Sequence, residues 1–270
     1  DVYKRQLQKQ LEKKNKQLLT ELLNLRGEIQ AMRSTYLTFT GKIVRISVST
    51  TTASEELKKL ISATEKLKKE LERTEAMSVY EKEHSDCQYI CGIDEVGRGP
   101  FAGPVVAGAV ILPKDDPILY LNDSKKLSEK KREALYDEIM ERAVATGIGV
   151  VSPARIDEIN ILQATYEAMR MAIGNLKVQP DLLLNDAVTI PEVEIPQVPI
   201  IKGDAKSVSI AAASIIAKVT RDRLMVEYDK VLPGYDFASN KGYGTKKHIE
   251  GLKELGPSPI HRRTFIKKYI

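Results

Sequence analysis

The sequence predicts an α/β fold in which helices cover a mixed β-sheet. From residue 88 onward, short β-branched apolar runs alternate with longer helical stretches. The first two apolar runs, at 89–93 and 104–112, follow each other as in a hairpin, whereas helical stretches separate the later ones. Hairpin succession followed by strand–helix alternation is typical of a sheet with antiparallel and parallel pairs.

Five apolar runs are the expected strands, because each is short and bounded by turn residues. They cover residues 89–93, 104–112, 146–151, 181–184 and 198–201. The expected helices cover residues 128–144, 153–175, 206–230 and 244–255. Ser128 and Ser152 are suited to N-capping, and Pro153 is suited to the first helical position.

One predicted helix, SIAAASIIAKVTRDRL at 209–224, is rich in small and branched apolar residues. Such residues permit close packing of a helix on a sheet, so we expect this segment to be mainly core. Its polar residues Lys218, Arg221 and Asp222 are expected to face solvent or phosphate.

The chain divides near residue 85, where its composition changes. Residues 1–84 carry 17 basic and 12 acidic residues, whereas the two types balance in 85–270. Apolar spacing of three and four predicts helices over 5–33 and 55–83, and β-branched residues at 35–52 predict one or two strands. We therefore expect a mostly helical, possibly coiled-coil-like extension at 1–84 and a second domain at 85–270. The extension's surplus of bases is expected to increase affinity for a polyanionic substrate.

Composition excludes several classes of protein. The chain is 42% hydrophobic with a mean hydropathy of −0.27, and none of its apolar runs approaches the roughly 18 residues of a membrane span. Cys87 and Cys91 are too few for a disulfide framework or a zinc site, so we expect reduced thiols in a cytoplasmic, non-membrane protein. The opening DVYKRQ resembles the translated ends of assembled environmental sequences and is expected to include non-native residues.

Acidic side chains follow three of the predicted strands. Asp94 and Glu95 end the first run, Asp186 follows the run at 181–184, and Asp204 follows the run at 198–201. Neighbouring side chains on a regular strand point to opposite faces, so Asp94 and Glu95 can serve one site only where the strand ends. Each acid alone is more often structural, but a set at separate strand ends indicates a ligand site.

Hard oxygen donors of this kind are what Mg²⁺ or Mn²⁺ prefers. Four carboxylates can hold two such ions about 4 Å apart, which suits the hydrolysis of a phosphodiester. The sequence therefore predicts a site for two divalent cations.

Basic and aromatic residues indicate a polyanionic partner. NDSKKLS at 122–128 offers Ser124, Lys125 and Lys126 to a phosphate, although a solvated lead-in to a helix is an equally simple interpretation. Tyr243 lies between two glycines amid lysines, where it can stack on a sugar or base or anchor a loop. Residues 259–263, PIHRR, are expected either to contact nucleic acid or to form a basic tail.

Taken together, the motifs of the second part of the chain resemble bacterial ribonuclease HII, the type 2 ribonuclease H family. The resemblance runs from about residue 80 to the C-terminus. It rests on GIDEVGRGPFAGPVVAGAVIL, LNDSKKLS, IIKGDAKSVSIAAASIIAKVTRD, PGYDFASNKGYGTKKH and PIHRRTF, which occur in this order. The GRGP after the acids favours this family over the related type HIII enzymes.

The resemblance implies a ribonuclease H-like mixed sheet flanked by helices, with a small C-terminal helical part that binds substrate. It implies that Asp94, Glu95, Asp186 and Asp204 are the catalytic and metal-binding residues. The implied activity is endonucleolytic cleavage of RNA–DNA hybrids and of single ribonucleotides in duplex DNA, on the 5′ side, leaving 3′-OH and 5′-phosphate ends. The implied roles are ribonucleotide excision and primer removal.

Substrate recognition is implied in the same way. Gly97, Arg98 and Gly99 would grip the ribonucleotide through backbone groups that sense the 2′-OH, and Tyr243 would stack on the neighbouring sugar. A 2′-OH distinguishes RNA from DNA at one position, and glycines let the backbone approach it. We expect a monomer, and the sequence leaves a protein partner open.

One departure and two alternatives accompany this interpretation. Asn185 stands where many family members have an apolar residue. A resolvase- or transposase-type nuclease would share the fold but cleave DNA that lacks ribonucleotides. A non-enzymatic coiled-coil protein that binds nucleic acid would not need the intact acids.

Overall fold

The computed structural model describes residues 48–270. Residues 70–113 and 117–270 form one compact unit, so this unit begins earlier in the chain than the change of composition near residue 85. The predicted helix at 5–33 lies outside the described residues. The strands predicted over 35–52 are wrong at residues 48–52, which lie in helix α2 (Val48–Ala76), and the rest of that range is outside the described part.

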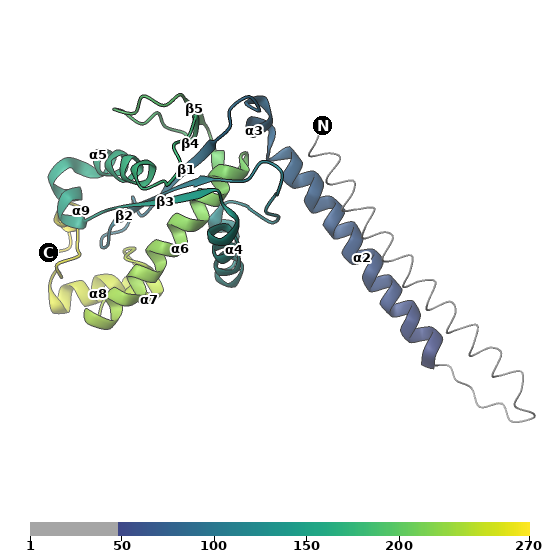
Figure 1. Ribbon diagram of the computed structural model, residues 1–270. Coiled ribbons are helices and arrows are strands. Elements are labelled where there is room, and N and C mark those ends of the chain that lie inside the picture. Colours follow the sequence, from purple (N-terminus) through teal and green to yellow (C-terminus); the bar gives the residue numbers. More distant parts are fainter. Residues whose placement is uncertain (1–47) are drawn as a thin grey trace, which may run out of the picture. The chain divides into compact units, whose positions relative to one another are not determined.

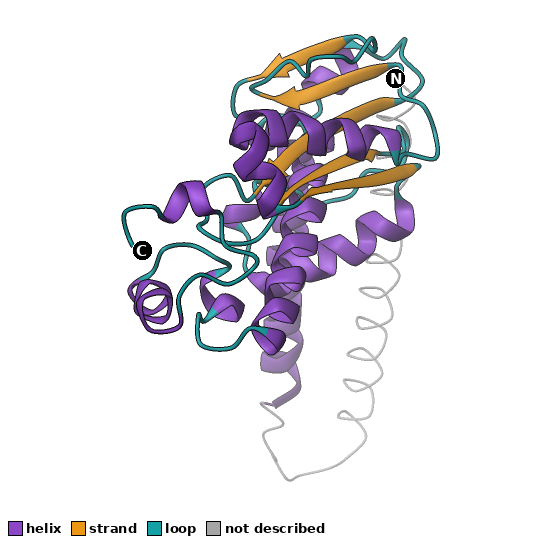
Figure 2. Ribbon diagram, turned by 90° about the vertical axis from the view of Figure 1, so that its left-hand side faces the viewer, coloured by secondary structure: helices purple, strands orange, loops and turns teal. Residues whose placement is uncertain are grey.

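A five-stranded mixed sheet is the centre of the compact unit (Figures 1 and 2). Its strands are β1 (Ile90–Val96), β2 (Val105–Ile111), β3 (Ala145–Val151), β4 (Leu182–Asp186) and β5 (Gln197–Ile200), in the order β3-β2-β1-β4-β5. The pairs β1–β2 and β2–β3 are antiparallel, whereas β1–β4 and β4–β5 are parallel. The five predicted strands and the mixed sheet are confirmed.

Helices cover both faces of the sheet (Figure 1). On one face, α5 (Pro153–Gly174) packs against alternate residues of β1, β2 and β3, with Ile93, Ala107 and Met169 fully buried. On the other face lies α6 (Val208–Val231), which α4 (Glu129–Arg142) flanks. Burial of both faces explains why β2 reads as a continuous apolar run.

The predicted helix starts are confirmed by their caps. The Ser128 hydroxyl accepts a hydrogen bond from the Lys131 N–H, and the Ser152 hydroxyl accepts one from the Arg155 N–H. Two short 3-10 helices, η1 (Ser124–Lys126) and η2 (Gly203–Ala205), lie just before α4 and α6. A short α3 (Val79–Glu83) follows α2, and the Glu81 carboxylate accepts hydrogen bonds from the Ser207 hydroxyl and the Ser209 N–H at the start of α6.

The C-terminal part is small and helical, as predicted. It comprises α7 (Phe237–Asn240), α8 (Lys246–Leu255) and α9 (Arg263–Ile266), and α7 packs against α6. Figure 1 shows α7 and α8 beside the C-terminal end of α6. A backbone pairing between Ala102 and His261 joins it to the turn after β1.

The approach of α6 to β1 is close enough to require glycine. A Cβ on Gly92 would lie 2.0 Å from the backbone carbon of Ser209, an impossible contact. We expect Gly92→Ala to lower the free energy of unfolding by at least about 2 kcal/mol, because backbone must move apart. Urea unfolding measures this change.

Gly174→Ala is the matched control. A Cβ at the end of α5 would meet no atom within 4 Å. This variant is expected to keep or gain stability, by up to about 1 kcal/mol. Equal stability of the two variants would contradict the close packing of α6 on β1.

Candidate active site

The predicted acids meet at the C-terminal ends of the parallel strands. Asp94 and Glu95 lie near the C-terminal end of β1, Asp186 is the last residue of β4, and Asp204 lies in η2 directly after β5. Because β1, β4 and β5 are parallel, their C-terminal ends face the same way. The four carboxylates interact electrostatically, with Asp186 acting on each of the other three.

Glu95 reaches this cluster from within a strand. The sequence left open whether the strand ends before Glu95, and the structure shows that it does not, since β1 continues to Val96 and Glu95 is paired with Ala107. The parallel register with β4 ends earlier, at Ile93 and Asn185. Glu95 therefore lies beyond the residues of β1 that pair with β4, and it still interacts electrostatically with Asp186 at the end of β4.

Burial and crowding act on the pKa values of these acids. Burial raises the pKa of Asp94 well above its usual value, and repulsion from Glu95 and Asp186 adds to the rise, while the Ser214 hydroxyl partly lowers it. Burial also raises the pKa of Glu95, although Arg98 opposes the rise. The pKa of Asp204 is raised by burial and then by Asp123 and Asp186. The cluster therefore favours a cation that neutralises it.

Backbone N–H groups hold two of the carboxylates. Asp94 Oδ1 accepts a hydrogen bond of 2.7 Å from the Glu95 N–H, and Asp186 Oδ1 accepts one of 2.7 Å from the Gly203 N–H. The second bond joins the end of β4 to η2. Lys202 precedes η2 with a φ of 58°, and this left-handed turn brings Asp204 back toward the sheet.

The chemistry of the donors fits Mg²⁺ or Mn²⁺, which take carboxylate oxygens. Within residues 48–270, however, no three acidic, histidine or cysteine side chains already converge as the ligands of one ion.

The predicted phosphate-binding residues lie beside the acids. Lys125 is exposed, and although burial lowers its pKa, the carboxylates of Asp94, Asp123 and Asp204 raise it overall. Ser124 is buried, and its hydroxyl lies 2.8 Å from that of Ser214. Asp123 is a fifth acid that we did not predict, and its place in the motif NDSKK, two residues before Lys125, was the available signal.

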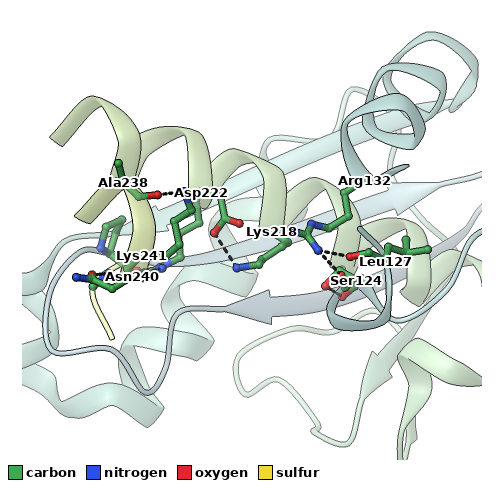
Figure 3. A network of polar contacts seen from close by, with 12 residues as sticks. Ser124, Leu127, Arg132, Lys218, Asp222, Ala238, Asn240 and Lys241 are labelled. Atoms are coloured by element: carbon green, nitrogen blue, oxygen red, sulfur yellow. Dashed lines mark hydrogen bonds and ion pairs between the residues drawn. The ribbon is translucent and has the colours of Figure 1, made fainter. Parts of the chain in front are cut away.

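Further polar contacts lie beside this segment, on α6 and in the region before Tyr243 (Figure 3). Arg132 donates to the carbonyls of Ser124 and Leu127. Lys218 and Asp222 form an ion pair of 2.8 Å on one side of α6, and Lys241 donates to the Ala238 carbonyl. Lys218 and Asp222 are each only about one-sixth exposed, so they lie at the rim rather than in free solvent.

The turn after the acids lies beside Tyr243. Gly97 is buried with a φ of 92°, a conformation that favours glycine. Arg98 and Gly99 are exposed, and the Arg98 guanidinium lies 3.3 Å from Glu95. A Cβ on Gly99 would lie 3.8 Å from the Tyr243 ring, which is 45% exposed. The turn and the tyrosine therefore border the same surface.

Three polar residues are more buried than the sequence suggested. Arg221, expected to face solvent or phosphate, is fully buried, as is Arg262. His261 is 2% exposed, and its Nε2 lies 3.0 Å from Nε2 of the buried His248. The basic-tail interpretation of 259–263 is wrong for His261 and Arg262, whose side chains form contacts inside the protein, whereas Arg263 is exposed.

The buried histidine pair supports the Tyr243 loop. His248 Nδ1 lies 2.8 Å from the Tyr243 carbonyl, and the His261 ring accepts a hydrogen bond of 2.9 Å from the Ser258 N–H. Phe237 and Tyr235 pack against both rings. An apolar surrounding of this kind favours neutral rings.

A ribonuclease H-like nuclease is the class of protein that this sheet order and the acidic strand ends define. Residues 91–268 match the family model described as ribonuclease HII. The chain is 75% identical over 203 residues to the ribonuclease HII of Lachnoclostridium phytofermentans, which covers 75% of this chain and 80% of that protein. It is 62% identical over 188 residues to that of Enterococcus faecalis, covering 70% and 72%.

Solved structures agree with this result. Ribonuclease H2 from Pyrococcus horikoshii aligns with a TM-score of 0.56 at 28% identity, over 67% of this chain and 97% of that one. A chain of the PCNA:RNase HII complex from Archaeoglobus fulgidus aligns with a TM-score of 0.56 at 31% identity, over 66% and 94%.

The chain belongs to the ribonuclease HII family. It is therefore an endoribonuclease of the ribonuclease H type, which acts on RNA–DNA hybrids. In the part of the chain that the structure describes, none of the helices is long and apolar enough to cross a membrane. Of the two cysteines, Cys91 is buried and Cys87 is half-buried, and they are not joined by a disulfide.

The histidine pair predicts a dependence of stability on pH. Burial, His248 and Arg263 lower the pKa of His261 from 6.5 to about 4. The unfolded chain therefore takes up this proton at a higher pH than the folded protein, so the contribution of neutral His261 is complete above pH 6.5 and is lost as the pH falls towards 4.

His261→Asn is the variant that isolates this effect. Between pH 7 and 4.5 the native protein is expected to lose about 1 to 2 kcal/mol more of its free energy of unfolding than the variant does. The comparison removes the opposite effect of the acidic cluster, which both proteins share. Parallel stability curves from chemical denaturation at each pH would contradict the prediction.

Proposed function

We propose that the protein cleaves the phosphodiester on the 5′ side of a ribonucleotide, in RNA–DNA hybrids and at single ribonucleotides in duplex DNA, leaving 3′-OH and 5′-phosphate ends. The observation that carries the proposal is the gathering of Asp94, Glu95, Asp186 and Asp204 at one sheet edge, directly beside the Gly97–Gly99 turn. In a cell this activity would serve ribonucleotide excision and primer removal, in the cytoplasm.

The four carboxylates would hold two Mg²⁺ or Mn²⁺ ions, which, when bound, activate a water and stabilise the leaving oxygen. Their burial supports this role. Asp94 and Asp204 are only 6% and 8% exposed, and the carboxylate of Asp186 repels both of them when no cation is bound. Buried like charges are costly unless a counter-charge compensates them. Lys125 and Arg98, which are exposed beside the acids, supply part of this positive counter-charge.

The other site residues would bind and orient the substrate. Arg98 and Lys125 are exposed beside the acids, where a phosphate could meet their side-chain N–H donors, whereas the Ser124 hydroxyl is buried against that of Ser214. The exposed backbone of Arg98 and Gly99 would form hydrogen bonds with the 2′-OH, the group that separates RNA from DNA. Tyr243, exposed beside Gly99, would stack on the neighbouring sugar.

Cleavage of matched duplexes tests the proposal. A duplex with one embedded ribonucleotide should be cut in Mg²⁺ or Mn²⁺, whereas the all-DNA duplex of the same sequence should not be. Cleavage of all-DNA junctions would favour a resolvase-type activity instead, and binding without cleavage in either metal would favour a non-enzymatic role.

Asp94→Asn tests the carboxylate cluster. Loss of this ligand is expected to reduce cleavage by at least about a hundredfold, more than the loss of an outer-shell partner costs. Because burial raises the pKa of Asp94, an uncharged asparagine should leave the melting temperature without metal unchanged or higher. Mg²⁺ should raise the melting temperature of the native protein and have a smaller effect on the variant.

Asp137→Asn is the control, because Asp137 is exposed on α4, outside the cluster. It should leave both cleavage and the effect of metal unchanged. Full activity of the Asp94→Asn variant would exclude the proposed role of the cluster.

A further inference from the structure

Two buried arginines lie beneath the turn that follows the acids. Arg221 belongs to α6 and Arg262 directly precedes α9, and both side chains are fully buried. Full burial is rare for arginine, and a buried cation is usually paired with an acid. The burial of two arginines near the proposed substrate surface therefore requires a physical explanation.

Arg262 binds the carbonyls of the turn itself. Its Nη1 donates to the Arg98 carbonyl at 2.9 Å, and its Nη2 donates to the carbonyls of Gly97 and Gly103. Its Nε also donates to the Gly103 carbonyl, at 3.0 Å. One guanidinium thus holds both ends of the 97–103 segment and draws the carbonyls of Gly97 and Arg98 inward.

Arg221 joins the same turn to the Tyr243 loop. Its Nε and Nη2 donate to the carbonyls of Pro104 and Ala102 at 2.9 and 3.0 Å, and its Nη1 donates to the Lys241 carbonyl at 2.8 Å. A Cβ on Gly97 would lie 2.3 Å from Arg221 Nε, so the turn rests on this side chain. The spacing of the turn from the Tyr243 loop depends on the planar fork of Arg221.

Neither arginine forms an ion pair with a carboxylate among residues 48–270. Carbonyl oxygens accept their hydrogen bonds, Arg262 also lies 5.1 Å from the centre of the Phe265 ring, and Asp222 and Asp157 act on the two charges only without direct contact. Burial lowers the pKa of Arg221 to about 10 and that of Arg262 to about 9, so both remain charged at neutral pH. Two like charges side by side are a poor source of stability, whereas a polyanion bound at the turn would compensate them.

We propose that Arg221 and Arg262 are positioning residues for ribonucleotide recognition. By occupying the inward carbonyls, they fix the backbone of the 97–99 turn so that its outward groups face the ribose, and their charge favours a phosphate there. This inference rests on the proposed function, and it adds two residues that do not themselves contact the substrate.

Arginine-to-lysine variants separate geometry from charge. Arg262→Lys and Arg221→Lys keep a positive charge but lose the fork that binds several carbonyls at once. The matched controls are Arg263→Lys and Arg223→Lys, which change exposed arginines one residue after Arg262 and two residues after Arg221. All four proteins are compared well below their melting temperatures.

The readouts are kcat for a duplex with one embedded ribonucleotide and the Kd for that duplex measured in Ca²⁺. We expect kcat to fall about ten- to a hundredfold in the Arg221 and Arg262 variants, because a shifted turn misplaces the ribose. The Kd should change less than about threefold, since the charge is retained. The controls should match the native protein in both.

Arg262→Gln removes the charge as well. It should weaken binding and reduce the dependence of log Kd on log salt, by up to about one phosphate contact. Unchanged kcat in folded Arg221→Lys and Arg262→Lys, or equal losses in the controls, would overturn the inference. Failure of the proposed function itself would be seen separately, as native protein that does not cleave the ribonucleotide duplex.

If the variants do not fold, amide hydrogen exchange of the native protein tests whether the arginines hold the turn. The N–H groups of Phe101, Ala102 and Gly103 bond to the carbonyls of Gly242 and Ile260 across the segment that the arginines hold. They should exchange as slowly as those of β2. Exchange at the rate of an open loop would show that the arginines do not hold the turn, and would overturn the inference.

Discussion

The close packing of α6 on β1 and β2 is the contact on which the site depends. Gly92 and the run of alanines at 211–213 let the helix lie directly on the sheet. From that position α6 places Ser214 beside Asp94 and Arg221 beneath the turn at Gly97. A helix held further away would separate Ser214 from Asp94 and Arg221 from the turn at Gly97.

The buried charges of this protein lower its stability but favour the binding of cations and phosphates. Burial and mutual repulsion raise the pKa of Asp94, Glu95 and Asp204, while the buried Arg221 and Arg262 form no ion pair among the described residues. A negative cluster suited to cations thus adjoins a positive support suited to phosphate.

Local patterns were sufficient for the elements and for the acids. Five apolar runs became five strands, and Ser128 and Ser152 cap the helices they precede, because strand and cap signals depend on neighbouring residues. Long-range contacts were not readable in the same way. Arg221, Arg262 and His261 looked exposed because their sequence neighbours are basic, but carbonyls and rings more than a hundred residues away, or on another loop, bury them.

The sequence by itself determined the family, the presence of both parallel and antiparallel strands, and which carboxylates follow the strands. These features depend on motifs and on the alternation of strands and helices along the chain. Only the tertiary structure decided how Glu95 approaches Asp186 from inside β1, that Asp123 joins the cluster, and that two arginines support the turn at Gly97. The physical reason is that registers between strands and hydrogen bonds between distant segments arise only when the whole core packs, so a single stretch of sequence does not encode them.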